Sequence, residues 1–289
     1  KRGGMALLLS VITGVSFFLG LLGSKERPEF AAAPAPGFRE SLRLTFRNRD
    51  FLFFLGANMM IQYVFLALAA AIPFYAKYVL RIQGPATFSG LTLDAELQNS
   101  LLLAAAFLAA LPAMIFWWWL ARRFGAWRSL RAACLLGAAV ALYFFFPTSF
   151  PGGLAGTVVF GLALAGLLML TNPLIADITD EDEVQTGMRR EGMFFGMNGL
   201  IIRFGVVIHG ILTALVFSLT RYVAPSEGVL YPAQPASALF GIRLLTAGFP
   251  ALALVIAFLL LGGYTLYGAR AERMRAEAAA LQAKRRANL

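Results

Sequence analysis

Long apolar stretches separated by short polar segments divide the chain of 289 residues. A helix of about 20 apolar residues crosses a bilayer core. On that criterion we predict seven membrane spans: residues 5–22, 51–76, 97–120, two within the uncharged run 132–176, 192–219 and 244–266. The two spans within 132–176 are separated by the turn-rich sequence PTSFPGG at 147–153.

The polar segments complete the predicted plan of the chain. Residues 25–49 contain a linker, AAAPAPG at 31–37, and four arginines among apolar residues in 38–51 predict an amphipathic helix on an anionic membrane surface. We therefore expect a single helix at 1–24, a cytoplasmic linker at 25–50, a six-helix bundle at 51–268 and a cytoplasmic tail at 269–289. One span followed by six is the layout of a transporter with two six-helix halves whose first five helices are missing from this sequence.

Composition agrees with a membrane protein. Hydrophobic residues make up 59% of the chain and charged residues 14%, against about 25% charged in soluble domains. The net charge of +10 does not indicate nucleic-acid binding, because the basic residues lie at the edges of apolar runs. Most of the 25 lysines and arginines fall on one side of the predicted spans, which places that side, the acidic segment after 176 and the C-terminus in the cytoplasm of an inner-membrane protein.

Arg203 is the sharpest candidate for function. It lies about 16 Å along a helix from the charged segment that precedes residue 192, near the bilayer midplane. An arginine at that depth costs about 2.5–3.5 kcal/mol unless it meets water or a counter-charge. Gly192, Gly196 and Gly210 share its helical face and leave room for a solute or a close helix. The alternative is an arginine that satisfies helix-end carbonyls inside the bundle.

A segment of acidic residues followed by two arginines precedes this span. On a short helix Asp177, Asp180 and Glu183 line one side, and Arg189 and Arg190 can reach back to them. Glu191 lies at the helix start, where the helix dipole favours an anion. The functional interpretation is a set of ion pairs that holds a cytoplasmic gate shut and breaks when the gate opens. The alternative is a solvated loop whose surface pairs contribute about 0–1 kcal/mol each. A calcium site lacks the glycine and ligand spacing of an EF-hand.

Three amides are further candidates for solute contact. Asn58 and Gln62 share a helical face and contact either a polar solute or a neighbouring helix. Asn172 precedes Pro173, where a helix break would line a cavity. His209 lies about 120° around the helix from Arg203, so we do not expect the two to form one site. We expect His209 to be a histidine of the bundle interior. No nucleophile set, metal cluster or phosphate loop indicates an enzyme, and we expect no cofactor and no metal.

The acidic segment also carries a family resemblance. The residues Ala176, Asp177, Asp180, Glu183, Thr186, Gly187, Arg189, Arg190, Glu191 and Gly192 resemble, at fixed spacing, the signature between helices ten and eleven of the glycoside–pentoside–hexuronide:cation symporters. These are the melibiose-permease-like branch of the major facilitator superfamily. The resemblance extends to 47–51 and to the basic loop 121–131, and covers the chain as helices six to twelve.

The resemblance implies an all-α major facilitator fold, here incomplete, with one helix of the N-terminal bundle and the six-helix C-terminal bundle. It also implies symport of a sugar-like solute with sodium or a proton by alternating access, with the coupling cation bound in the absent half. The family's helix-eleven cation, typically lysine, aligns with Arg203, and an arginine there does not release a proton. Glu181 stands where the family often has an aromatic residue.

Other functions stay open at this point. A related branch carries lysolipids, so an amphiphilic solute is an alternative. The chain begins with Lys1 rather than Met, which leaves a truncated, non-transporting membrane fragment as another. The oligomeric state is not predicted.

Overall fold

The structure is a computed structural model, and it describes residues 2–23, 38–88, 91–188, 190–229 and 231–287. Nearly all of these residues are helical. The helices are α1 (Arg2–Gly23), α3 (Phe38–Arg47), α4 (Arg49–Phe74), α5 (Ala95–Phe124), α6 (Ala126–Tyr143), α7 (Phe150–Thr186), α8 (Glu191–Leu219), α9 (Ala236–Arg243), α10 (Phe249–Leu260) and α11 (Ala269–Ala287). The strands β1 (Ala86–Phe88) and β2 (Leu91–Leu93) form an antiparallel hairpin.

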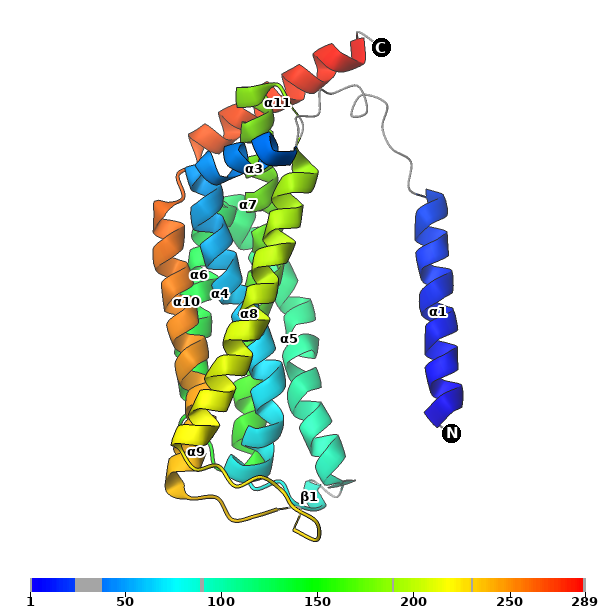
Figure 1. Ribbon diagram of the computed structural model, residues 1–289, viewed down its shortest axis with the longest axis vertical. Coiled ribbons are helices and arrows are strands. Elements are labelled where there is room, and N and C mark those ends of the chain that lie inside the picture. Colours follow the sequence, from blue (N-terminus) through cyan, green and yellow to red (C-terminus); the bar gives the residue numbers. More distant parts are fainter. Residues whose placement is uncertain (1, 24–37, 89–90, 189, 230, 288–289) are drawn as a thin grey trace.

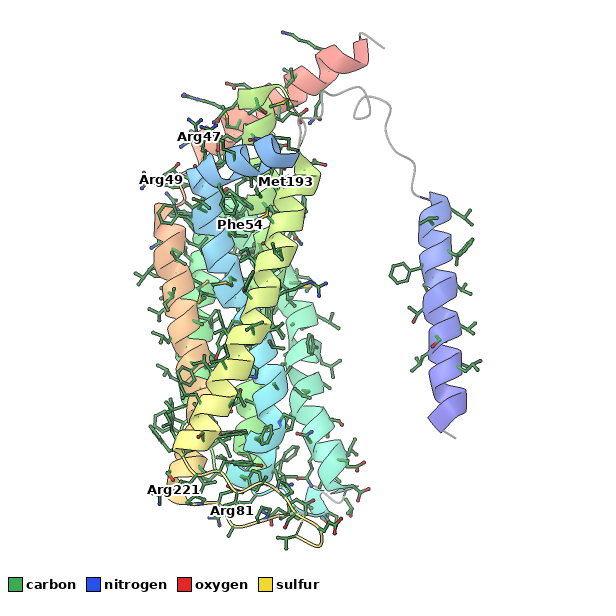
Figure 2. The ribbon with its side chains drawn as sticks, in the orientation of Figure 1. Arg47, Arg49, Phe54, Arg81, Met193 and Arg221 are labelled. Carbon is green, nitrogen blue, oxygen red and sulfur yellow. The ribbon has the colours of Figure 1, made fainter. Side chains whose placement is uncertain are left out.

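The long helices α4 to α10 form one upright bundle, and α1 lies apart from it (Figure 1). Within the bundle α7 packs against α5 and α6, and α4 packs against α8 and α10. Helices α3 and α11 lie across one end, together with the C-terminal turns of α7. We call this the charged end. The opposite end carries β1, β2 and α9 and is called the hairpin end. Figure 2 shows Arg47 and Arg49 at the charged end and Arg81 and Arg221 at the hairpin end.

Small residues set the closest helix contact, between α5 and α7. A side chain at Gly161 would place its Cβ 2.4 Å from the carbonyl oxygen of Ala106, so only glycine fits there. At Gly166 the Cβ would lie 2.7 Å from Ala133 and Trp117. The Trp117 indole donates a hydrogen bond to the Leu162 carbonyl at 2.6 Å. Such close backbone approach is how helices associate where lipid removes the hydrophobic drive between them.

Prolines mark two local changes of helical pitch. Pro73, near the end of α4, is followed by a π-helical turn at Tyr75–Val79. A second π-helical turn, Leu244–Gly248, precedes Pro250 in α10. A proline has no N–H, so the carbonyl four residues before it loses its α-helical hydrogen bond. A π-helical turn pairs carbonyls with N–H groups five residues later and so accommodates this change. Helical structure is therefore continuous over 49–79 and 236–263.

The spans predicted from sequence correspond to helices, with shifted bounds. Within the part of the chain that the structure describes, five helical stretches are long and apolar enough to cross a membrane: Arg49–Val79, Ala95–Phe124, Phe150–Thr186, Glu191–Leu219 and Ala236–Gly263. The helix α6 is present but shorter, and α1 contributes the shorter apolar stretch Leu7–Leu22. This is the predicted all-α membrane fold, in partial form.

Several polar segments differ from the sequence-based prediction. The basic loop predicted at 121–131 is helical except at Gly125, whose φ of 87° turns the chain between α5 and α6. The acidic segment after 176 is not a loop, because α7 continues to Thr186 and ends at Gly187 with φ 68°. The C-terminal tail is the helix α11. The amphipathic helix predicted at 38–51 ends at Arg47, since Asn48 caps a new helix by accepting from the Phe51 N–H at 2.9 Å.

Candidate functional site

The acidic residues at the end of α7 are paired with basic residues of α11. Asp177 accepts two hydrogen bonds from Arg275, from Nε at 2.6 Å and from Nη2 at 2.7 Å. The Asp177 side chain is buried and that of Arg275 is half exposed. The hydrogen bond to Asp177 is the largest cause of the raised pKa of Arg275. A two-point contact of this kind fixes the orientation of both groups.

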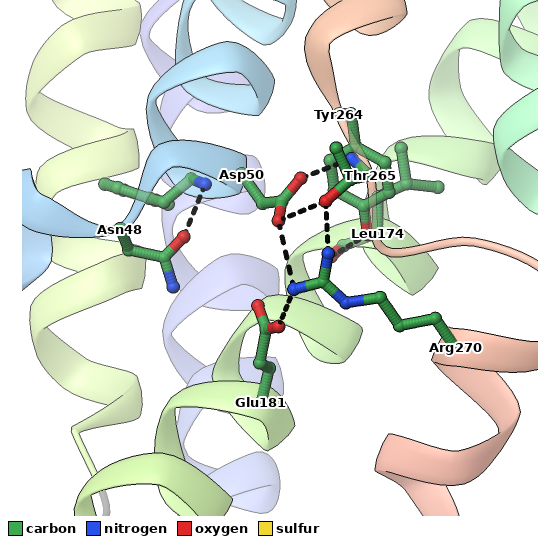
Figure 3. Close-up of polar contacts among 8 residues, drawn as sticks. Asn48, Asp50, Leu174, Glu181, Tyr264, Thr265 and Arg270 are labelled. Atoms are coloured by element: carbon green, nitrogen blue, oxygen red, sulfur yellow. Dashed lines mark hydrogen bonds and ion pairs between the residues drawn. The ribbon is translucent and has the colours of Figure 1, made fainter.

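A second arginine of α11 joins three elements at the charged end (Figure 3). Arg270 donates to Glu181 of α7 at 2.5 Å and to the Thr265 hydroxyl at 2.5 Å, and its Nη2 lies 3.8 Å from Asp50 of α4. The Asp50 carboxylate accepts from both the backbone N–H and the hydroxyl of Thr265, the latter at 3.0 Å. Glu181 is 2% exposed. The start of α4, the end of α7 and α11 are thereby tied together.

Asp182 and Arg190 form the most buried ion pair at this end. Arg190 Nε donates to Asp182 Oδ2 at 3.0 Å, and Arg190 Nη2 contacts the other carboxylate oxygen. The Asp182 side chain is 7% exposed and the Arg190 side chain is 2% exposed. The pair bridges the turn between α7 and α8, and the Arg190 guanidinium lies 5.9 Å from the centre of the Phe194 ring.

The pairing differs from the one expected from spacing. The spacing predicts that Arg190 reaches Asp177, Asp180 or Glu183. In the structure Arg190 pairs with Asp182, while Asp177 pairs with α11 and Glu183 accepts from Gln282 at 3.3 Å. Asp180 and Glu191 are half-buried at the same end. Arg189 lies outside the described residues. Helical continuation of α7 explains the change, because it turns successive acids toward different neighbours.

Arg203 lies near the middle of α8, as predicted, on an exposed face of that helix. Gly205, two residues further on, faces α4, where a Cβ would lie 3.8 Å from the Met59 carbonyl oxygen. Two residues correspond to about 160° around an α-helix, so Arg203 is turned away from α4. Among the described residues it has no hydrogen-bond or ion-pair partner. Any counter-charge therefore comes from outside the described bundle.

The glycines that share this face leave it open. A Cβ at Gly192, Gly196 or Gly210 would meet no described atom within 4 Å. Neighbouring apolar residues such as Phe204 and Val207 are more than half exposed. The face of α8 that carries Arg203 is thus smooth, apolar and unpartnered within the described bundle, apart from one permanent charge.

The three candidate amides have different surroundings. Asn58 is buried and donates to the Asn198 side chain of α8 at 2.8 Å, which is the interhelical alternative left open by the sequence. The side-chain oxygen Oδ1 of Asn58 is buried and has no hydrogen-bond partner among the described residues. Gln62 is half-buried on α4, and Asn172 is exposed on α7. Pro173 does not break α7, so no helix break lies beside Asn172.

Sequence reasoning missed Asn198, Arg270 and Arg275 as polar partners. Asn198 lies seven residues before Gly205, on the face of α8 that meets α4, and that periodicity is a usable signal. His209 lies on the same face and is buried, with Nε2 3.3 Å from the Thr213 hydroxyl and its ring centre 6.0 Å from that of Tyr63. Among the described residues no group of three or more His, Cys, Asp or Glu side chains is placed to hold a metal.

This arrangement defines a helical membrane bundle with a charged, internally paired end and with an arginine, Arg203, near the middle of the apolar helix α8. The chain belongs to the family described as MFS/sugar transport protein, which matches residues 3–267. The description of this family is one of transport proteins.

Three curated relatives are similar to the chain. An uncharacterised symporter of Synechocystis sp. is 27% identical over 273 residues, covering 87% of this chain and 47% of the relative. A glucuronide carrier protein homologue of Escherichia coli is 26% identical over 263 residues, covering 90% of this chain and 53% of the relative. An uncharacterised symporter of Bacillus subtilis is 31% identical over 93 residues, covering 32% of this chain and 19% of the relative. The chain thus spans about half the length of the first two relatives.

Proposed function

We propose that the protein containing this chain is a secondary active symporter that couples sodium or a proton to uptake of a sugar or glycoside-like solute by alternating access. The observation that carries the proposal is Arg203, a charge halfway along an apolar helix that has no partner among the described residues, in a member of a sugar transport family. Such a charge is retained where a solute, water or a counter-charge meets it. One named relative is a glucuronide carrier homologue, and a hexuronide carries a carboxylate that an arginine binds well.

In this proposal the chain supplies helices six to twelve, with the charged end and the C-terminus in the cytoplasm of an inner-membrane protein. The basic residues of α3 and α11, two helices that lie at the charged end, support the orientation. The coupling cation binds in the half that precedes this chain. Gln62 and Asn172 contact the solute, since neither has a hydrogen-bond partner among the described residues.

The ion pairs at the charged end hold together the helices that form one side of the cytoplasmic gate. The pairs of Asp177, Glu181 and Asp182 lie within the bundle rather than between two bundles. They therefore keep α4, α7, α8 and α11 together as the gate opens. The intrabundle pairs are retained through the transport cycle, and the gate opens between rigid units.

Uptake in vesicles tests this function. The full-length protein is reconstituted, and accumulation of radiolabelled glycosides, pentosides and hexuronides is followed under an imposed sodium gradient, an imposed proton gradient or neither. We expect one class of solute to accumulate against its gradient with one of the two ions. Absence of gradient-driven accumulation for every sugar-like solute, in vesicles where insertion is verified, would falsify the proposal.

A further inference from the structure

An apolar pocket of about 230 Å³ opens between α4, α5 and α7. Its floor is buried and includes Ile72, Phe144 and Phe160, each 5% exposed or less. Its mouth is formed by the exposed residues Ala69, Phe107 and Leu168. The pocket therefore has a closed bottom inside the bundle and an open entrance on the bundle surface.

The interior of the pocket offers a ligand almost no polar contact. Of the described lining residues only Thr157 carries a polar side-chain atom, and its hydroxyl already donates to the Leu154 carbonyl at 2.9 Å. Water is held in a cavity by two to four polar partners, and apolar cavities stay dry. The pocket is thus suited to an apolar group.

Two amides extend the lining on one side only. Gln62 precedes the lining residue Phe65 by three positions on α4, and Asn172 follows the lining residue Leu168 by four positions on α7. Residues at these spacings share a helical face. Since α4 begins at the charged end and α7 ends there, both amides lie on the side of the pocket toward the charged end. Neither amide has a hydrogen-bond partner among the described residues.

We propose that this pocket binds the apolar substituent of an amphipathic glycoside, while Gln62 and Asn172 bind its sugar hydroxyls. The inference rests on the proposed transport function and names the solute class more closely. A dry cavity of about 150 Å³ holds benzene, so a pocket of about 230 Å³ admits a substituted aromatic ring or a short alkyl group. A lipid acyl chain fits the rim less well, because it would leave both amides without partners.

Matched glycosides test the inference on the full-length protein. Methyl and phenyl glycosides of the same sugars are compared as competitors of uptake and, by calorimetry on purified protein, as ligands. We expect the phenyl member to bind at least tenfold more tightly, because burial of a ring adds favourable apolar transfer. Equal affinities of the two members would overturn the proposal.

Variants at the mouth identify the place of binding. Ala69→Phe fills the entrance and should reduce the phenyl advantage to less than twofold, with methyl glycoside binding retained. Ala70→Phe is the matched control, because Ala70 is exposed and does not line the pocket. Leu168→Gln, which places a polar group in the entrance without filling it, is the second variant. A phenyl advantage that persists in both Ala69→Phe and Leu168→Gln would overturn the assignment.

The same measurements separate this inference from the function on which it rests. Binding of phenyl glycosides that is lost in Ala69→Phe, without any gradient-driven uptake, would support the pocket and remove the transport proposal. Uptake with no effect of the substituent would retain transport and overturn the pocket. A lipid that native mass spectrometry finds on the protein, and that Ala69→Phe removes but phenyl glycosides do not displace, would also overturn it.

Discussion

The charged end and the middle of α8 both place ionised side chains in a largely apolar bundle. The two regions differ in whether those side chains have partners of opposite charge. At the charged end Asp182 and Arg190 are both buried and are paired with each other, and Asp177 and Glu181 have partners on α11. In the middle of α8 the Arg203 side chain is exposed and has no partner among the described residues.

The difference separates charges that serve this bundle from a charge that serves something else. Removing one member of a buried pair destabilises the bundle, because it leaves the other charge buried and uncompensated. An exposed arginine without a polar partner contributes little to the stability of the bundle. Mutations at the two places should therefore affect different properties, namely stability at the charged end and solute uptake in the middle of α8.

The largest effect is expected from Asp182→Ala. This change leaves the Arg190 guanidinium buried without its partner, which costs about 3–5 kcal/mol. The measurement is the thermal melting of the purified full-length protein in detergent. Gln185→Ala, at an exposed position of the same helix, is the control and should change stability by less than about 0.5 kcal/mol. Melting of the Asp182 variant at the wild-type temperature would mean that the pair is not formed.

The second effect concerns uptake rather than stability. We expect Arg203→Ala to reduce gradient-driven solute accumulation by at least about tenfold, which corresponds to about 1.4 kcal/mol. The amount of protein in the membrane and its melting temperature should stay unchanged, because the side chain has no hydrogen-bond or ion-pair partner among the described residues. Arg203→Lys keeps the charge and should retain part of the uptake. Undiminished accumulation in the alanine variant would remove Arg203 from the site.

The smallest effect is expected at the polar link between α4 and α8. Asn198→Ala removes the hydrogen bond with Asn58 at 2.8 Å. Interhelical hydrogen bonds in membranes contribute about 0.6 kcal/mol on average, so a small decrease in melting temperature should follow. Leu200→Ala, at an exposed position of the same helix, serves as the comparison. A loss as large as that of Asp182→Ala would show that the buried Asn58 amide depends on Asn198 far more than an average bond.

Sequence patterns predicted the helices well and their polar ends poorly. Apolar length alone located α4, α5, α7 and α8, because a bilayer demands about 20 apolar residues whatever the tertiary contacts are. It missed that α7 continues to Thr186 through five acidic residues, since charge in isolation indicates a solvated loop. Three of those acids are paired in the structure: Glu181 with Arg270, Asp177 with Arg275 and Asp182 with Arg190.

Glu181 illustrates the same limit at one position. It departs from the aromatic residue that the family resemblance leads one to expect, and in the sequence it has no evident partner. In the structure Glu181 is buried and receives a hydrogen bond from Arg270, 89 positions away in the chain. Only the packing of α11 on α7 brings the two residues together.

The sequence by itself determined that this protein is a helical membrane bundle, that its basic residues gather at one end and that an arginine stands midway along an apolar span. These features follow from hydropathy and charge along the chain, which a bilayer sorts by depth. The tertiary structure decided which acid pairs with which base and that the Asn58 side chain forms a hydrogen bond with a neighbouring helix. It also decided that a dry pocket opens between α4, α5 and α7. Those facts depend on which helical faces meet, and distant segments settle that together.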